Sequence, residues 1–515
     1  VDNSRLLLLS ATPLYNSYKE IILLISLMNL NDNKDPIKEK DIFDNEGNFL
    51  TSKDGKQIGK ELLIQKSTGY ISYVKGENPY SFPFRIWPGY FDKSKELDLS
   101  VYPINQLNDK SITNPIEFLS LYSVNLGEIQ KLGYNYIIAN EIKRRDFNKA
   151  LESSKELDSL GYTELQKPIQ ALNILYPNEE LLEDKEFDYN TLISTSGLDK
   201  IMNYTKSYNP PSETNFEYKN IDKYGRIFAP DQIGKYSGKI KEICKNIINS
   251  DGIILIYSQY IDSGVVPMAL ALEEMGIRRY GDVPSLFKTK PVNDLDLKTY
   301  TNNNNPGNIP AKYTMIVGDV RLSPKINKIK DKEVLTSKEN LNGEKIKIVL
   351  ITKTGSEGID FKNIRQIHIM EPWYNLNRIE QIIGRGVRNC SHKDLPFIER
   401  NVQLFLYGSL LENKQNEAAD LYLYRLAEKK SKIIGKITRL LKEISIDCLL
   451  NKGQLNFMEE NIKQQVTIKL SNRNEIMYQI GDKPFSSTCD YMDNCFYKCY
   501  PNDDVKEIND LSNNK

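Results

Sequence analysis

The sequence predicts an α/β fold in which helices cover both faces of a parallel sheet. The main observation is that, after residue 234, short apolar runs alternate with amphipathic stretches. Strands buried on both faces read as continuous apolar runs, and parallel strands need a crossover that is usually a helix. The second observation is size and composition: 515 residues, 40% of them hydrophobic and 27% charged, suffice for roughly three to four domains.

The expected elements follow in chain order. An apolar run that ends in small residues predicts a buried strand at 5–10, and a helix follows at 18–30. The heterogeneous stretch 31–231 is interpreted as a mixed α/β insertion with its own small core, including helices at 116–128 and 147–160. The predicted parts are residues 1–30 (the end of a first domain), 31–231 (the insertion), 232–412 (the main α/β domain) and 413–515 (a helical extension with a cysteine-containing tail).

The third part carries the alternating pattern. Its expected elements are helix 239–249, strand 253–257, helix 265–275, strand 313–317, helix 323–335, strands 346–351 and 366–370, helix 376–387 and strand 402–407. A long amphipathic helix is predicted at 417–450.

Composition excludes several classes of protein. Basic and acidic residues number 69 each, which excludes a polycation or an acidic tail protein. No apolar run approaches the roughly 18–20 residues of a membrane helix, so we expect a soluble, intracellular protein without a membrane partner. Six scattered cysteines fit a reducing compartment better than a disulfide framework.

The most specific motif is the run QIIGRGVR, with Gln381, Gly384, Arg385 and Arg388 in the pattern QxxGRxxR. It lies on the helix expected after a strand. Two arginines three residues apart share a helix face, and their planar forks can clamp a terminal phosphate. A solvated basic turn is the alternative for this motif taken by itself.

A glycine-rich loop precedes that motif and directly follows the strand predicted at 346–351. It reads TKTGSEGID and contains Thr352, Thr354, Gly358 and Asp360. Loops at the carboxyl ends of parallel strands are where such sheets bind ligands. Asp360 can accept a hydrogen bond from a ribose hydroxyl or orient Arg385; a plain turn is the alternative.

A third motif, SATPLYN at residues 10–16, follows the first predicted strand. Its Ser10 and Thr12 hydroxyls can join a hydrogen-bond relay between two sites. This short motif is weak evidence by itself. The three motifs are stronger evidence together, because they occur in the expected order along the chain.

Together the motifs resemble those of superfamily 2 helicases and translocases. Residues 10–16 are similar to motif III, 352–360 to motif V and 381–388 to motif VI, and 256–259 (IYSQ) lies where motif IV is expected. The run EPWYN at 371–375 favours the Swi/Snf-type branch. Most of the chain resembles the helicase-like NTPases of large DNA viruses, a group that includes the poxvirus early transcription factor small subunit and nucleoside triphosphate phosphohydrolase I.

This resemblance implies a RecA-like helicase C-terminal domain that binds ATP, with Mg²⁺, against a second such domain. It implies that Arg385 and Arg388 contact the ATP phosphates. The other implied roles are Gln381 and Gly384 at the phosphate site, Gly358 and Asp360 on the ribose side, Ser10 and Thr12 in coupling, and Ser258, Thr352 and Thr354 at the nucleic-acid backbone.

The sequence departs from this family at the phosphate-binding loop, because GxxxxGK[ST] does not occur in it. The nearest match, Gly55–Glu61, is one residue short and is interpreted as a turn. Since the first residue is Val1, we expect most of the first RecA-like domain and most of the Mg²⁺ site to lie upstream. These 515 residues alone are then expected not to hydrolyse ATP.

The functional expectation is the carboxyl-terminal part of an ATP-dependent helicase or translocase of viral transcription or genome handling, with duplex DNA favoured. A viral RNA polymerase or a transcription factor subunit is the expected partner, in the virion or a cytoplasmic viral factory. The alternative is a non-catalytic scaffold subunit derived from a helicase.

Lesser signals leave alternatives open. Seven basic residues and one acidic residue lie between Arg425 and Lys442, which suits either a phosphate-tracking stripe or a solvated helix face. Cys489, Cys495 and Cys499 are expected to be free thiols, with a zinc site as the alternative and no metal predicted. His368 is expected in the core and His392 in a surface loop.

Overall fold

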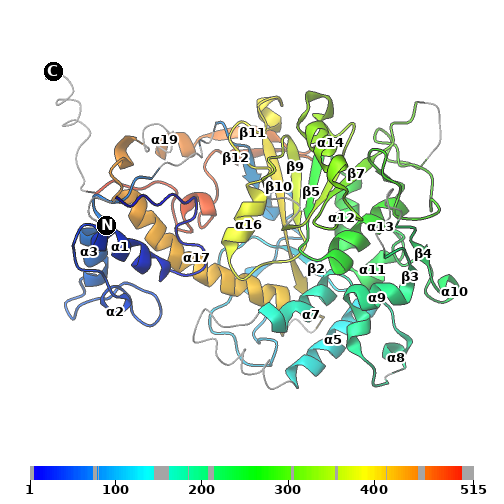
Figure 1. Cartoon of the computed structure of the whole chain (residues 1–515), viewed down its shortest axis with the longest axis horizontal. Helices are drawn as coiled ribbons and strands as arrows, with labels where there is room; N and C mark the ends of the chain where they lie inside the picture. Colours follow the sequence, from blue (N-terminus) through cyan, green and yellow to red (C-terminus); the bar gives the residue numbers. More distant parts are fainter. Residues whose placement is uncertain are drawn as a thin grey trace.

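The computed structural model describes residues 5–500 apart from 74–77, 79, 144–161, 184, 207–213, 303–306, 354–357, 413–414 and 451–458. A parallel sheet lies between helices, and a long helix, α17 (Ala419–Glu443), runs from that sheet to a group of helices from the start of the chain (Figure 1). Within these residues, no helix is long and apolar enough to cross a membrane.

The sheet joins eight strands in the order β1-β10-β9-β5-β8-β7-β6, and β2 pairs with β10. Its pairings are all parallel. The strands are β1 (Phe84–Ile86), β2 (Tyr122–Asn125), β5 (Ile253–Tyr257), β6 (Arg278–Arg279), β7 (Lys312–Ile316), β8 (Ile348–Ile351), β9 (Ile364–Ile369) and β10 (Asn401–Leu410). Strands predicted at 253–257, 313–317, 346–351, 366–370 and 402–407 are therefore confirmed.

Alternate residues of the central strands enter two cores. Ile254 and Leu350 face one core, with α12 (Gly238–Ile248) and α13 (Val266–Glu274). Leu255 and Val349 face the other, with α16 (Leu376–Ile383) and the start of α17. The fold class predicted from the sequence, helices on both faces of a parallel sheet, is confirmed.

The remaining elements are short or peripheral. They are α1 (Glu20–Asn31), α2 (Glu39–Ile42), α3 (Ile58–Ser67), α4 (Pro88–Phe91), α5 (Glu128–Ile142), α7 (Tyr162–Asn173), α8 (Glu179–Leu182), α9 (Ser194–Ile201), α10 (Ile221–Tyr224), α11 (Ile233–Tyr236), α14 (Lys325–Thr336) and α19 (Glu459–Ile462), with the hairpins β3 (Met202–Asn203)–β4 (Glu217–Tyr218) and β11 (Gln465–Lys469)–β12 (Glu475–Gln479).

The stretch 31–231 adds strands to the sheet, and other parts of it pack with α17 in two hydrophobic clusters that contain no sheet strand. Its strand β1 pairs with the first residues of β10, and β2 pairs with the last ones. The helix expected at 116–128 is wrong, because part of that range is β2, whereas the one expected at 147–160 lies outside the described residues. The four-part division of the chain stays a prediction.

The strand expected at 5–10 is also wrong. Leu7 and Leu9 are 79% and 86% exposed, and no described strand pairs with this stretch. The helix expected next is α1, which packs with α2 and α3 against Ile437 and Leu440 in the second half of α17. Gly59, in the supposed phosphate-loop match, is a packing residue, since an added Cβ would lie 2.1 Å from Ile42 O.

Most of the basic stretch on α17 is paired with carboxylates of the same chain rather than forming a free stripe or a solvated face. Arg439 and Lys442 are buried and both pair with Asp490 of the tail. Arg425 pairs with buried Glu417 at 2.6 Å. These cations hold the tail and the start of α17 in place; Lys429 and Lys436 are exposed.

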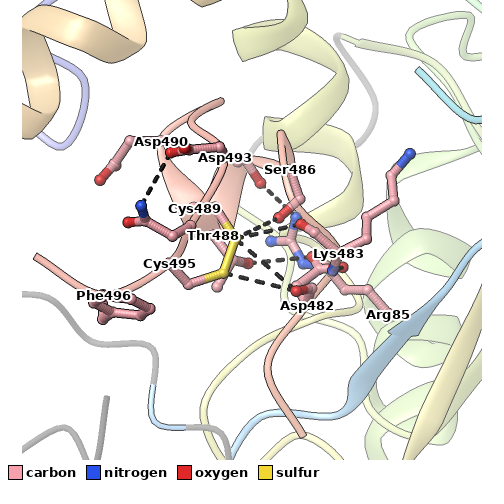
Figure 2. The surroundings of a disulfide bond; sticks show 12 residues. Arg85, Asp482, Lys483, Ser486, Thr488, Cys489, Asp490, Asp493, Cys495 and Phe496 are labelled. Atoms are coloured by element: carbon pink, nitrogen blue, oxygen red, sulfur yellow. Dashed lines mark hydrogen bonds between the residues drawn. A yellow bond between two sulfur atoms is a disulfide. The ribbon is translucent and has the colours of Figure 1, made fainter. Parts of the chain in front are cut away.

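The tail packs back onto α17 and carries disulfides. Cys489 is joined to Cys495, and Cys448 to Cys499; Figure 2 shows the first of these beside Asp482, Lys483 and Arg85. The expectation of free thiols is wrong for Cys489, Cys495 and Cys499, because each of them is bonded to another cysteine. Among the described residues, no three potential ligands are placed to hold a metal ion.

Candidate nucleotide site

The two arginines of the QxxGRxxR motif lie in a turn beyond α16. This helix starts where Asn375 accepts a hydrogen bond from Arg378 N at 3.2 Å, and it ends at Ile383, with Gly384 as its C-cap. The expectation that the arginines share a helix face is therefore wrong. The chain turns because Gly386 packs directly on β9, where an added Cβ would lie 3.1 Å from the Ile364 side chain.

This arginine turn, residues 384–388, is attached to the glycine-rich loop. Phe361 N donates to Arg385 O at 2.8 Å, and the Arg388 guanidinium forms an ion pair with Asp360. Gly358 has φ +73°, a backbone conformation that favours glycine. The structure thus brings Asp360, Arg385 and Arg388 together, with Gly358 two residues before Asp360; Asp360 pairs with Arg388 rather than with Arg385, and the roles expected of these residues stay predictions.

Two further residues stabilise this arrangement and were missed from the sequence. His392 Nε2 donates to Ile364 O at 2.6 Å, and Ser391 Oγ lies 2.8 Å from His392 Nδ1. Since the carbonyl can only accept, Nδ1 is the acceptor for the serine hydroxyl. Burial lowers the pKa of His392 to about 3, so the ring is neutral. His392 is 1% exposed, so its expected place in a surface loop is wrong; only the fold reveals its carbonyl partner.

The charges of the turn suit an anionic ligand such as the phosphates of ATP. Within the described part of the chain, the Arg385 guanidinium has no hydrogen-bond or ion-pair partner, and it is half-buried. Arg388 and Asp360 have side chains that are 47% and 57% exposed, so their ion pair is weak and can be exchanged for a stronger one. Gln381 is exposed on the last turn of α16. These residues fit a phosphate-binding role; ATP itself would supply the phosphoryl group.

Two of the residues expected near a nucleic-acid backbone, Ser258 and Thr352, are buried. Ser258 is 1% exposed, and its hydroxyl donates to the Glu371 carboxylate at 3.0 Å. Thr352 is 5% exposed. Both hydroxyls are buried in this structure, and the place of these residues near a nucleic-acid backbone stays a prediction. Thr354 lies outside the described residues.

Ser258 instead belongs to a buried polar network below the site. Glu371 also accepts from Gln259 N at 2.5 Å and from Asn173 Nδ2 at 2.7 Å. Burial raises the pKa of Glu371. Lys239 donates to Asn173 Oδ1 at 3.4 Å and to Met370 O at 2.7 Å, and it pairs with Asp420 at 2.9 Å. The network thus joins the residues that follow β5 and β9 to α7, α12 and α17.

The SATPLYN segment reaches α16 through its backbone. Asn377 Nδ2 donates to Leu14 O at 3.0 Å and to Tyr15 O at 2.5 Å. Thr12 N donates to Ser10 Oγ at 3.1 Å, and in the described structure no hydrogen bond joins either residue to the arginine turn. Asn377 was missed because its partners are carbonyl groups more than 360 positions away. The coupling role of Ser10 and Thr12 stays a prediction.

His368 is buried in the sheet, as predicted. Its Nδ1 lies 2.7 Å from the Tyr407 hydroxyl and its Nε2 3.1 Å from Gln366 Oε1. Burial lowers its pKa to about 3. It is a core residue rather than a part of the site.

With the fold and the arginine turn described, the class of domain can be stated. Residues 308–390 match the helicase conserved C-terminal domain. This range contains β7, β8, β9, α16 and the arginine turn. The chain therefore carries a helicase C-terminal domain, as the motif resemblance implies.

The chain is also similar to helicase-like viral proteins. It is 25% identical to the putative ATP-dependent RNA helicase R563 of Acanthamoeba polyphaga mimivirus, over 88% of this chain and 62% of that protein. It is 31% identical to the termination factor NPH-I homolog of African swine fever virus (isolate Tick/Malawi/Lil 20-1/1983), over 42% of this chain and 33% of that protein. The chain thus spans less than two thirds of either relative.

Among solved structures, the Sulfolobus solfataricus SWI2/SNF2 ATPase core domain is similar with a TM-score of 0.27 and 13% identity, over 56% of this chain and 39% of that chain. That score is too low to define a common arrangement of domains. The sequence relatives and the domain match confirm the resemblance to superfamily 2 helicase-like viral proteins.

Proposed function

We propose that this chain is the carboxyl-terminal part of an ATP-dependent nucleic-acid translocase or helicase that acts in viral transcription or genome handling. The observation that carries the proposal is the arginine turn. A backbone hydrogen bond from Phe361 holds Arg385 beside the glycine-rich loop, an ion pair with Asp360 holds Arg388 there, and neither guanidinium has a buried counter-ion among the described residues. Such a pair can stabilise the negative charge of phosphates.

The proposed roles are those that the motif resemblance implies. Arg385 and Arg388 contact the terminal phosphates, and Arg388 exchanges Asp360 for them. Gln381 and Gly384 lie at the same site, and Gly358 lets the loop approach the ribose. We place the phosphate-binding loop and most of the Mg²⁺ ligands in an upstream part of the intact protein, so the isolated chain is proposed to be inactive.

Duplex DNA is the proposed substrate because the motifs resemble the Swi/Snf-type branch. The relatives include proteins named as RNA helicases, so RNA is the competing substrate. The measurement is the ATPase rate of the intact protein with duplex DNA, single-stranded DNA and RNA; the proposal requires the largest stimulation by duplex DNA. A viral RNA polymerase or a transcription factor subunit is the proposed partner.

The central test is Arg388→Ala in the intact protein. We expect nucleic-acid-stimulated ATP hydrolysis to fall by a factor of about 10³ or more, the range known for arginine fingers. The matched control is Arg278→Ala, which removes another half-exposed arginine paired with an aspartate, Asp294. Unchanged hydrolysis in Arg388→Ala would favour the alternative, a non-catalytic scaffold subunit, whose binding to nucleic acid or polymerase would persist without ATP.

A further inference from the structure

A polar cavity lies at the edge of the sheet where the parallel strands begin, and it shares no residue with the arginine turn. Its volume is about 340 Å³, within the range of small-molecule sites. It is lined by residues that precede or begin the strands: Asp251 before β5, Lys347 before β8, Arg365 in β9 and Glu399 before β10. Lys469, at the end of β11, and Tyr300 also line the cavity.

Lys347 is the unusual residue of this cavity. It is only 2% exposed, and its Nζ donates to Ser250 O at 2.7 Å and lies 3.4 Å from the Tyr300 hydroxyl. No carboxylate in the described structure is within ion-pair distance of it. Burying an ammonium group without a counter-ion is unfavourable, and an ammonium has three N–H groups, of which these contacts use at most two.

Two of the three carboxylates that line the cavity are engaged by other cations, and the third, Glu344, accepts hydrogen bonds from Asn342 N and Nδ2 at 3.0 Å. Asp251 accepts two hydrogen bonds from the Arg473 guanidinium, at 2.9 and 3.0 Å. Glu399 lies 3.2 Å from Lys469 Nζ and 3.7 Å from Arg365 Nη1. The cavity therefore offers an uncompensated positive charge at Lys347 and a second buried cation, Arg365, that is 4% exposed.

We propose that this cavity binds a small oxyanion, a phosphate or carboxylate group, with the Lys347 ammonium as its counter-ion. Arg365 Nη1 faces Glu399 at a distance beyond a hydrogen bond, so it adds a donor at the same site. A nucleic-acid strand does not fit this role, because Lys347 is too deeply buried for a phosphodiester with sugars on both sides. The site is independent of the arginine turn and of the function proposed above.

The protonation of Lys347 gives the site a pH dependence. Burial lowers the pKa of Lys347 to about 8; nearby Asp251 opposes this shift and Arg473 adds to it. The other charged or titratable groups that face the cavity are Lys298, Tyr300, Glu344, Arg365, Glu399 and Lys469. The charged form is needed for binding, so affinity is present below this pKa and is lost as the pH rises through it.

The test is isothermal titration calorimetry on this chain, with inorganic phosphate and succinate as the two probes at fixed ionic strength. We expect Lys347→Met to weaken binding of the preferred probe at least tenfold. Lys345→Met removes an exposed cation two positions away, which pairs with Glu339, and is expected to bind as wild type does. Arg388→Ala is also expected to bind normally; loss of binding there would place the anion at the arginine turn and overturn the proposal.

A second measurement does not depend on a variant that folds. For the wild-type chain, the affinity for phosphate should fall by up to tenfold per pH unit above about pH 8.5, where phosphate itself no longer changes charge. A flat profile, or binding by Lys347→Met equal to wild type, would overturn the assignment. So would the failure of both probes to bind, while succinate binding without phosphate binding would identify the ligand as a carboxylate.

Discussion

Arg85 is expected to hold together parts of the chain that are far apart in the sequence. From β1, its Nη1 donates to Glu380 Oε2 on α16 and to Ser487 Oγ in the tail, both at 2.7 Å. The side chains of Arg85 and Glu380 are 9% and 20% exposed. Removing one partner of a buried ion pair costs about 3–5 kcal/mol. Since Glu380 keeps some contact with water, we expect Arg85→Met to lower the free energy of unfolding by about 2–3 kcal/mol.

The assay is urea unfolding followed by tryptophan fluorescence. The chain has two tryptophans, and both report on this region. Trp87 follows β1 and donates to Asp482 of the tail at 2.9 Å, whereas the Trp373 ring lies 3.8 Å from the Arg378 guanidinium on α16. A double-mutant cycle with Glu380→Gln isolates the pair, and we expect a coupling energy of about 2 kcal/mol.

The matched control is Arg473→Met. Arg473 also pairs with a carboxylate, that of Asp251, but both side chains are about half exposed, 53% and 46%. Exposed pairs contribute about 0–1 kcal/mol. If Arg85→Met lost no more stability than this control, or if the coupling energy were near zero, the reasoning that the pair is effectively buried would be refuted.

Two other predictions concern His392 and Gly435. Burial lowers the pKa of His392 to about 3, against about 6.5 in the unfolded chain, so its stabilising contribution is complete above about pH 6.5 and declines by about 1.4 kcal/mol per pH unit as the pH falls toward 3. The measurement is the free energy of unfolding in urea at several pH values, for which we expect His392→Gln to show a slope smaller than that of the wild type by this amount. Equal slopes for the two proteins would contradict a buried, neutral ring. On α17, an added Cβ at Gly435 would lie 2.0 Å from Asp490 O, so Gly435→Ala should lower the free energy of unfolding by about 1–3 kcal/mol. Exposed Lys436→Ala should change it by less than about 0.5 kcal/mol, and equal effects of the two substitutions would show that the tail does not pack on α17 in this way.

The central strands could be predicted from the sequence because each is buried on both faces. In β5 and β8 every residue is apolar and buried, which leaves a continuous apolar run. The edge strands β1 and β2 give no such signal, since they are three and four residues long and alternate with polar residues. At residues 5–10 the sequence instead predicts a strand that these described residues do not form. Apolar residues indicate a preference for burial, but a strand also needs a neighbouring strand to pair with.

The same limit applies to charged residues. Local spacing identified Arg385 and Arg388, but it also suggested a basic stripe from Arg425 to Lys442, although Arg439 and Lys442 are neutralised by Asp490, some fifty positions away in the tail. The density of basic residues along a helix does not distinguish a cation that binds a ligand from one that is paired within the protein. The distinction depends on the counter-ion, which is usually distant in the sequence. In the described structure Arg385 has no counter-ion, and Lys347 has none although it is buried. Unsatisfied positive charge is therefore the common physical basis of both proposed anion sites, and it predicts that removing either cation should affect its own ligand and leave the other site intact.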